Sequence, residues 1–181
     1  MKRTIIFAIV AASALLVSCN KESRELMYAN QESNIEKFVN KQLETDPEAR
    51  VIYNGGATRV VMTEGEGVEL TARGRASILY AGYNFKTGSV GASTLFVTNN
   101  SDYASSVNWT LSDGYVFEAL EMDMTDKGIL QGLRDGLEGV RTGEECYILF
   151  SGKYAFGKSN IGTIPANSPL AFRVWVLSVE N

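Results

Sequence analysis

The chain has 181 residues, of which 17 are Lys or Arg, 21 are Asp or Glu and none is His, for a formal net charge of −4. The absence of histidine excludes His-based catalytic triads, His-ligated metal sites and the usual general base near neutral pH. The sequence has no basic block interleaved with aromatic residues, so we expect no nucleic-acid partner. We also expect no metal and no cofactor.

The first 18 residues have the pattern of an export signal. Lys2 and Arg3 precede an almost wholly apolar run, 4–17, which is shorter than the about 20 residues of a permanent membrane span. The run ends in Leu16-Val-Ser-Cys19, which resembles the lipobox of bacterial lipoproteins. We therefore expect a signal peptide at 1–18, lipid on Cys19 and a protein anchored at the cell envelope, on its periplasmic face or at the cell surface. An uncleaved anchor is the alternative.

Only two cysteines occur, Cys19 and Cys146. If Cys19 carries lipid, no disulfide within the chain is possible. Cys146 lies in an alternating apolar stretch, which predicts a buried thiol rather than a nucleophile.

Residues 19–48 combine a tether with an N-terminal helix. The polar segment 20–25 predicts a flexible tether. Helical periodicity from Arg24 to Pro47 places four apolar residues on one stripe: Ile35, Phe38, Val39 and Leu43. This helix either packs on its own domain or forms a dimerisation or docking arm, which would make the protein a homodimer.

Residues 49–181 form the predicted folded domain. Stretches rich in β-branched and aromatic residues predict strands at 51–53, 58–63 and 75–80. Asn54-Gly-Gly56 and Gly65-Glu-Gly67 predict turns, since no phosphate-binding sequence follows either. The polar stretch 97–114 predicts a surface insertion, which is either functional or disordered.

The C-terminal third predicts further strands and one short helix. Strands are expected at 115–120, 144–150 and 170–177, and Asp126 is expected to cap the helix. The helix places five apolar residues on one face: Ile129, Leu130, Leu133, Leu137 and Val140. The predicted fold class is α+β, an antiparallel sheet wrapped on one short helix.

Five segments occur in a telling order: 129–140, Gly143-Glu-Glu145, Tyr154-Ala-Phe-Gly157, Gly162-Thr-Ile-Pro165 and Pro169–Val174. Together they resemble the FKBP-type peptidyl-prolyl cis-trans isomerase domain, as a divergent member of that family in a bacterial lipoprotein. The resemblance extends from Gly65 to Asn181 and implies an apolar pocket between helix and sheet.

The resemblance also implies which residues line that pocket. In chain order they are Tyr80, Phe96, Val97, Leu120, Ile129, Leu130, Leu133, Phe156, Ile164 and Phe172. Phe117 replaces Leu120 if the register shifts after the insertion. The Leu130 backbone N–H would bind the substrate carbonyl. The residues taken as catalytic are Tyr80, Phe96, Leu130, Phe156 and Phe172.

Three of these positions depart from the family pattern. Leu133 stands where the family usually has Trp, Val97 where it has Asp and Phe156 where it has a hydrogen-bonding Tyr. The last two changes remove polar contacts, each worth about 0.5–1.5 kcal/mol. Weak or absent activity is the expected consequence.

Prolyl isomerisation suits a chain without histidine. Its barrier of about 18–20 kcal/mol comes from amide resonance, and a dry pocket favours the twisted amide without nucleophile or metal. We expect an isomerase or chaperone that acts on Xaa-Pro segments of envelope proteins. The alternatives are a non-catalytic peptide- or protein-binding module that retains the fold, and a structural protein that acts through its N-terminal helix.

Overall fold

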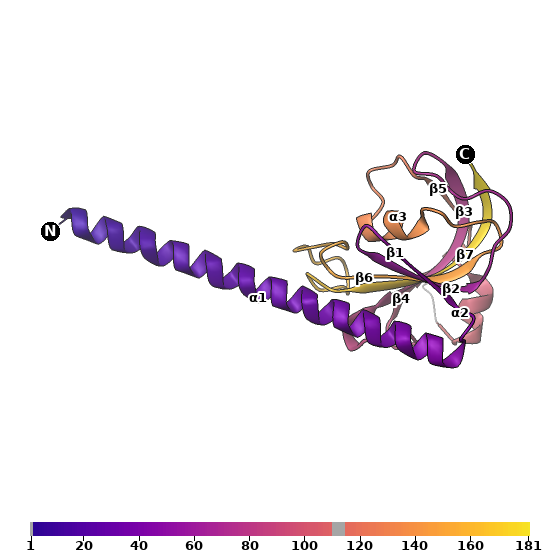
Figure 1. Ribbon diagram of the computed structural model, residues 1–181, viewed down its shortest axis with the longest axis horizontal. Helices are drawn as coiled ribbons and strands as arrows, with labels where there is room; N and C mark the ends of the chain where they lie inside the picture. The colour runs from indigo at the N-terminus through magenta and orange to yellow at the C-terminus, as the bar shows by residue number, and fades with distance from the viewer. Residues whose placement is uncertain (1, 110–114) are drawn as a thin grey trace.

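The computed structural model describes residues 2–109 and 115–181, and the side chains of residues 21–109 and 115–181. The described strands form one antiparallel sheet with the order β1-β2-β6-β7-β3-β4, and β5 also pairs with β3 (Figure 1). The strands are β1 (Arg50–Asn54), β2 (Ala57–Thr63), β3 (Arg75–Asn84), β4 (Leu95–Thr98), β5 (Leu120–Asp123), β6 (Glu145–Phe150) and β7 (Leu170–Glu180). The helices are α1 (Lys2–Thr45), α2 (Ser101–Ser106), α3 (Gln131–Leu137) and the 3-10 turn η1 (Phe85–Thr87). The predicted α+β fold is confirmed.

The long strand β3 organises the sheet. One edge pairs with β7 over its whole length, from Arg75↔Glu180 to Asn84↔Leu170. Its other edge is shared, because β5 pairs with residues 75–78 and β4 with residues 81–83. Tyr80 therefore lies at the gap between β4 and β5.

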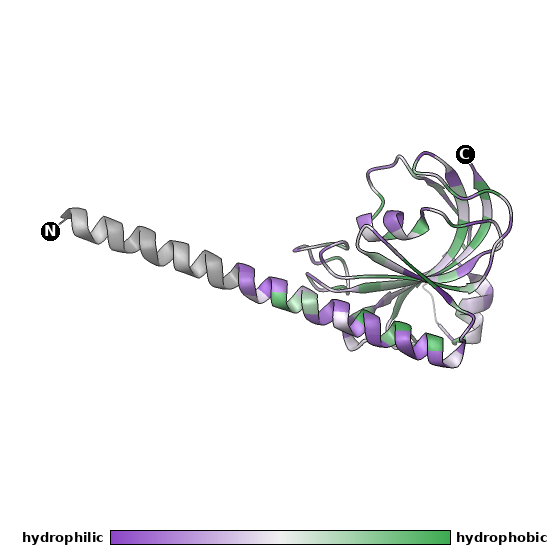
Figure 2. Ribbon diagram, in the orientation of Figure 1, coloured by the Kyte–Doolittle hydropathy of each residue, from purple (hydrophilic) through white to green (hydrophobic). Residues whose placement is uncertain are grey.

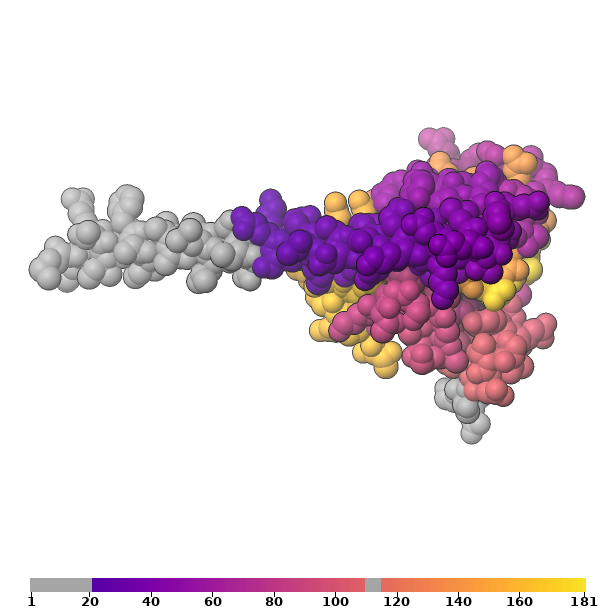
Figure 3. Space-filling model, turned by 60° about the horizontal axis from the view of Figure 1, so that its bottom comes forward, coloured from indigo at the N-terminus to yellow at the C-terminus, as the bar shows by residue number. Residues whose placement is uncertain are grey.

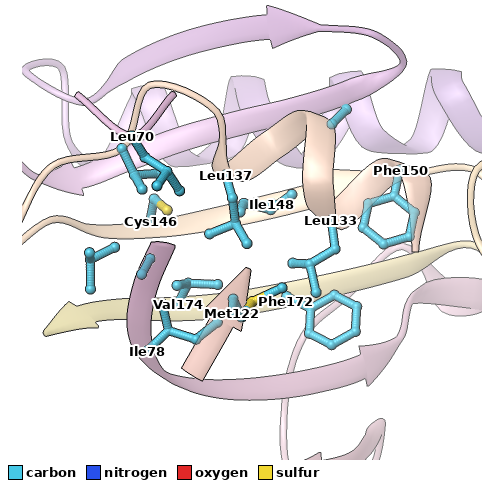
Figure 4. Packing of buried hydrophobic residues seen from close by; sticks show 14 of the residues in the cluster. Leu70, Ile78, Met122, Leu133, Leu137, Cys146, Ile148, Phe150, Phe172 and Val174 are labelled. Carbon is cyan, nitrogen blue, oxygen red and sulfur yellow. The ribbon is translucent and has the colours of Figure 1, made fainter. Parts of the chain in front are cut away.

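The two faces of the sheet carry separate cores. On one face, α3 packs over β6 and β7, with Leu137 and Ile148 buried between them (Figure 4). On the other face, α1 covers the sheet with Ile35, Phe38 and Val39. The period of two in β7 supplies both cores, as expected: Phe172 faces α3 and Ala171 faces α1.

The N-terminal helix packs on its own domain, one of the two expected alternatives. The Phe38 ring meets Phe85 and Tyr147 edge-on, with centroids 5.5 Å away in both cases. Polar residues cover the outward side of the helix (Figure 2), which lies across the body of the molecule (Figure 3). Residues 20–25, expected to be a flexible tether, are helical, since no Gly or Pro interrupts the helix there.

The signal peptide at 1–18 and lipidation of Cys19 concern side chains outside the described part of the chain. Within residues 21–109 and 115–181, no helix is both long enough and apolar enough to span a membrane. Cys146 is fully buried in the core beneath α3, which confirms its predicted position.

One predicted strand is shifted, and one predicted helix cap does not form. The strand expected at 115–120 is found as β5 at Leu120–Asp123, because pairing with β3 places the Met122 side chain in the core. Asp126 does not cap α3. Its carboxylate instead accepts the Gly128 N–H at 2.8 Å in a preceding turn, and α3 has no side-chain cap.

The expected insertion at 97–114 is partly regular. Val97 and Thr98 end β4, and residues 101–106 form α2. The Asn100 side chain caps α2 by accepting the Tyr103 N–H at 3.0 Å. Residues 110–114 lie outside the described part of the chain.

Candidate functional site

Aromatic rings converge on Phe172 at the end of the core beneath α3. Phe150 stacks on Phe172 with centroids 5.9 Å apart, and Phe96 meets it edge-on at 6.2 Å. Tyr80 lies on a further side at 6.1 Å. Gly82 permits this arrangement, since a Cβ there would lie 2.9–3.0 Å from Phe96, Val97 and Phe172.

Helix α3 closes the same cluster from above. Leu133 points from the helix toward Phe150 and Phe172 (Figure 4) and is only 9% exposed. The close approach depends on Gly132, because a Cβ there would lie 2.2 Å from the Phe150 ring. An apolar floor is the result.

The structure brings most of the sequence-predicted lining residues together. The floor residues are buried and the rim residues half-buried, and they belong to one cluster: Tyr80, Phe96, Ile129, Leu130, Leu133, Phe156, Ile164 and Phe172. The Val97 side chain lies beside them, since it and Phe96 and Phe172 would all contact a Cβ on Gly82. The site is an apolar surface with a buried floor and a partly open rim.

Leu120 does not lie in this cluster. It pairs with Ile78 at the start of β5 and is 40% exposed. Phe117, the alternative for this position, is half-buried and packs on the Tyr115 ring at 5.3 Å. The shift of the strand after the insertion explains why neither residue takes the expected place.

The side chain of Asn99 fills the gap in the sheet beside Tyr80. Its Oδ1 accepts the Tyr80 N–H at 2.6 Å, and its Nδ2 donates to the carbonyls of Ile78 at 3.1 Å and Glu118 at 2.9 Å. Thr98 Oγ1 donates to the Tyr80 carbonyl at 2.7 Å. The backbone that carries Tyr80 is therefore fixed although neither β4 nor β5 pairs with it.

Two hydrogen-bond donors at the rim lack partners within residues 21–109 and 115–181. One is the Tyr80 hydroxyl, whose surroundings act on it through burial and the nearby Tyr115 and through no hydrogen bond. Burial raises the pKa of Tyr80, so its hydroxyl keeps its proton at neutral pH. The other is the Leu130 backbone N–H, just before α3, where no described acceptor reaches it.

The loop 151–169 supplies the remaining wall with Phe156 and Ile164. The backbones of Ile161 and Ile164 bond to each other at 2.9 and 2.8 Å, which makes a tight turn. The loop is tied to α3 by Gly132, whose N–H donates to the Tyr154 carbonyl at 3.0 Å.

A buried ion pair that the sequence did not reveal secures the other end of α3. Arg59 Nη1 donates to the carbonyls of Gly136 and Glu138, both at 2.8 Å, and its Nε lies 3.3 Å from Glu144 Oε1. These bonds satisfy carbonyls at the helix end and place a positive charge there. Burial raises the pKa of Glu144, and Arg59 opposes this. An arginine within the apolar stretch 57–63 was the only available signal.

No group of three or more His, Cys, Asp or Glu side chains suited to a metal ion lies in the described part of the chain. What the arrangement offers is an apolar floor and two free donors. Such a surface can hold a small apolar ring and bind the carbonyl groups next to it.

The fold and site define an α+β domain whose short helix and twisted sheet enclose an aromatic-lined surface. The model of the FKBP-type peptidyl-prolyl cis-trans isomerase family matches residues 86–177, which are 92 of the 181 residues. The chain belongs to this family. Of the clustered lining residues, Tyr80 alone lies before the matched segment.

Solved structures of the same fold agree. FkpA from Escherichia coli has a TM-score of 0.57 at 20% identity, with 97% of this chain and 71% of that chain covered. A peptidyl-prolyl cis-trans isomerase from Pseudomonas syringae pv. tomato has a TM-score of 0.56 at 16% identity, with 87% and 96% covered. The three FKBP domains of wheat FKBP73 have a TM-score of 0.57 at 18% identity, with 72% and 50% covered. No curated protein matches the chain.

Proposed function

We propose that this protein is a peptidyl-prolyl cis-trans isomerase and chaperone for Xaa-Pro segments of polypeptides. The observation that carries the proposal is the meeting of an apolar floor with two free donors. Leu133, Ile164 and Phe172 form the floor, and the Leu130 N–H and Tyr80 hydroxyl stand at the rim.

The chemistry follows from this arrangement. When a proline ring binds to the apolar floor, the preceding amide is removed from water. This environment favours the twisted amide, because that form is less polar than the planar one. The Leu130 N–H holds a substrate carbonyl and the Tyr80 hydroxyl can hold a second, so that rotation occurs between fixed ends. This mechanism requires neither a nucleophile nor a general base among the clustered residues.

A non-catalytic binding module is the second candidate, and the residues at the site favour it specifically. Val97 and Phe156 contribute no polar group, and Leu133 gives a smaller floor than Trp would. Such a module would bind the same segments without accelerating their isomerisation.

Exchange spectroscopy by NMR on a short Xaa-Pro peptide distinguishes the two candidates. Catalysis is expected to raise the cis–trans exchange rate above that of the peptide alone. Binding without a change in rate would support the module, and no binding would refute both candidates. The triple variant Val97→Asp, Leu133→Trp, Phe156→Tyr restores the three family residues. It is expected to increase the exchange rate if these substitutions alone limit catalysis.

We also propose that the protein is exported and anchored through lipid on Cys19, with envelope proteins as clients. Lys2, Arg3, the apolar run 4–17 and the ending Leu-Val-Ser-Cys support this. Mass spectrometry of the mature protein should find an N-terminal diacylated Cys19, and Cys19→Ser should abolish the modification. An unmodified N-terminus that still includes residues 1–18 would contradict the proposal.

A homodimer through α1 would have to use residues outside the buried stripe. Leu26 is 65% exposed and lies near the start of the described side chains. Analytical ultracentrifugation of the full chain and of Leu26→Ser tests this assembly: a dimer that Leu26→Ser dissociates would establish it.

A further inference from the structure

The N-terminal helix is bonded to the loop that carries part of the site. Gln31 on α1 makes two hydrogen bonds: its Oε1 accepts the Gly152 N–H at 2.9 Å and its Nε2 donates to the Asn167 carbonyl at 2.8 Å. One turn earlier, the Tyr28 hydroxyl donates to Asn167 Oδ1 at 2.7 Å. All three bonds reach the two ends of the loop 151–169.

These two ends touch each other at the place where α1 meets them. A Cβ on Gly152 would lie 2.2 Å from the Asn167 carbonyl oxygen, so the backbone closes tightly there. Asn167 has a left-handed backbone with φ of 58°, which Asn tolerates better than most residues. Gln31 therefore bridges the base of the loop with one side-chain amide.

Tyr28 and Gln31 continue the stripe by which α1 packs on the sheet. They precede Ile35 by seven and four residues, spacings that keep them on one helix face. Tyr28 is 9% exposed. Where the helix passes from the sheet to the loop 151–169, the residues of this stripe change from apolar to hydrogen-bonding. The atoms of the loop, coloured gold in Figure 3, lie against α1.

Open space lies on both sides of this contact. A groove of about 540 Å³ runs along Tyr28 and Tyr154, and another of about 420 Å³ along Gln31 and Pro165. Side-chain packing is therefore incomplete around the base of the loop, so the three hydrogen bonds from α1 help to set its position, together with the Gly132–Tyr154 bond to α3. Inside the loop, Gly157 donates to the Gly152 carbonyl and Asn167 to the Gly157 carbonyl, so a shift at the base moves Phe156.

We propose that Tyr28 and Gln31 are positioning residues, which hold the loop 151–169 so that Phe156 and Ile164 form the wall of the proline site. The N-terminal helix is thus a component of the site and does not serve only as a connection to the membrane. This inference rests on the proposed function for its effect on substrate, but the loop position itself can be measured without substrate.

The test compares Gln31→Ala and Tyr28→Phe with Asn40→Ala, an exposed position on the same helix, in the full chain. Amide hydrogen exchange at Gly157 and Asn167 reports loop opening, since neither amide bonds to α1. We expect roughly tenfold faster exchange in Gln31→Ala and roughly threefold in Tyr28→Phe, with no change in Asn40→Ala.

Substrate kinetics supply the second readout. An opening loop lowers the fraction of molecules competent to bind, so KM for an Xaa-Pro peptide should rise by roughly five- to tenfold in Gln31→Ala while kcat stays unchanged. If the wild-type protein binds without catalysis, Kd should rise by the same factor.

Unchanged exchange at Gly157 and Asn167 in both variants would overturn the proposal, as would lower global stability with unchanged KM or Kd. If Gln31→Ala fails to fold, Tyr28→Phe decides, because it removes one hydroxyl only. If the wild-type protein neither isomerises nor binds proline peptides, the proposed function fails, and the exchange data still decide whether α1 holds the loop.

Discussion

Two tyrosines three residues apart on β3 have opposite roles. Tyr83 faces the α1 side of the sheet, is 1% exposed, and donates its hydroxyl to Tyr103 Oη at 2.5 Å. Tyr80 faces the α3 side, and in the described part of the chain its hydroxyl has no partner. The fold pairs one hydroxyl and leaves the other unpaired within the described residues, as the proposed binding site requires.

The variants Tyr80→Phe and Tyr83→Phe should therefore have opposite effects. Tyr80→Phe should weaken binding of an Xaa-Pro peptide by about 0.5–1.5 kcal/mol and leave the free energy of unfolding nearly unchanged. Tyr83→Phe should lower the free energy of unfolding by about 0.5–1.5 kcal/mol, because it removes the hydrogen bond to the half-buried Tyr103 hydroxyl. Urea titrations and peptide titrations measure the two quantities. Loss of stability in Tyr80→Phe would mean that its hydroxyl has a structural role.

Tyr83 also predicts how stability depends on pH. Burial, followed by the hydrogen bond with Tyr103, raises the pKa of Tyr83 far above its usual value. The folded protein then keeps this proton at a pH where the unfolded chain loses it. The stabilising contribution is full below about pH 10, the ordinary tyrosine pKa, and is lost as pH rises above it. Urea midpoints from about pH 9 to 11 should fall less steeply in Tyr83→Phe than in wild type. Equal slopes would show that Tyr83 does not cause the decline.

At the scale of the elements, α3 lies close against the sheet. Two glycines one turn apart, Gly132 and Gly136, face β6, and a Cβ on either would lie 2.2 Å from the side chain of Phe150 or Ile148. This approach brings Leu133 and the Leu130 N–H to the aromatic floor. The position of α3 therefore sets the dimensions of the site.

Gly132→Ala should destabilise the protein by about 1–3 kcal/mol through overpacking against Phe150, although alanine favours helix by about 1 kcal/mol. It should also weaken binding of proline peptides, since α3 must move away from the sheet. Gly91→Ala is the control, because no atom lies within 4 Å of a Cβ there. Chemical denaturation measures the stability of the two variants, and peptide titration measures their binding. Equal stabilities would show that α3 adapts to the extra methyl group without a loss of stability.

For the whole molecule, the N-terminal helix completes the fold. The sheet has an apolar side facing away from α3, and α1 covers it with Ile35, Phe38 and Val39. The hydrogen bonds of Tyr28 and Gln31 then connect the same helix to the site. The lipid proposed for Cys19 would be joined to the domain by a helix that forms part of its core.

Phe38→Ala should accordingly lower the free energy of unfolding by about 3–5 kcal/mol, the usual cost of deleting a buried aromatic ring. Leu26→Ala on the same helix should change it by less than about 0.5 kcal/mol, because Leu26 is 65% exposed. Guanidinium titrations of both variants test this. Equal stabilities would mean that α1 detaches from the sheet in solution.

Local patterns in the sequence were sufficient for much of the fold. The period of two in 144–150 and 170–177 and the stripe at Ile35, Phe38 and Val39 reflect burial of alternate or helically spaced side chains, which each segment specifies by itself. The ordered segments 129–140, 154–157 and 162–165 likewise identified the family, and the residues that they contribute to the expected lining lie in one cluster.

Other features depended on contacts between distant segments, which no local pattern specifies. The register of β5 moved Leu120 out of the site, because Met122 had to enter the core opposite β3. Three polar side chains bond to groups far away in the sequence. Arg59 pairs with Glu144, 85 positions away, and Asn99 binds the backbone of Tyr80, 19 positions away. Gln31 binds the backbone of the loop 151–169, at least 121 positions away. From the sequence alone, a polar side chain is expected to be solvent-exposed. Only the three-dimensional fold determines whether it is buried and which group it bonds to.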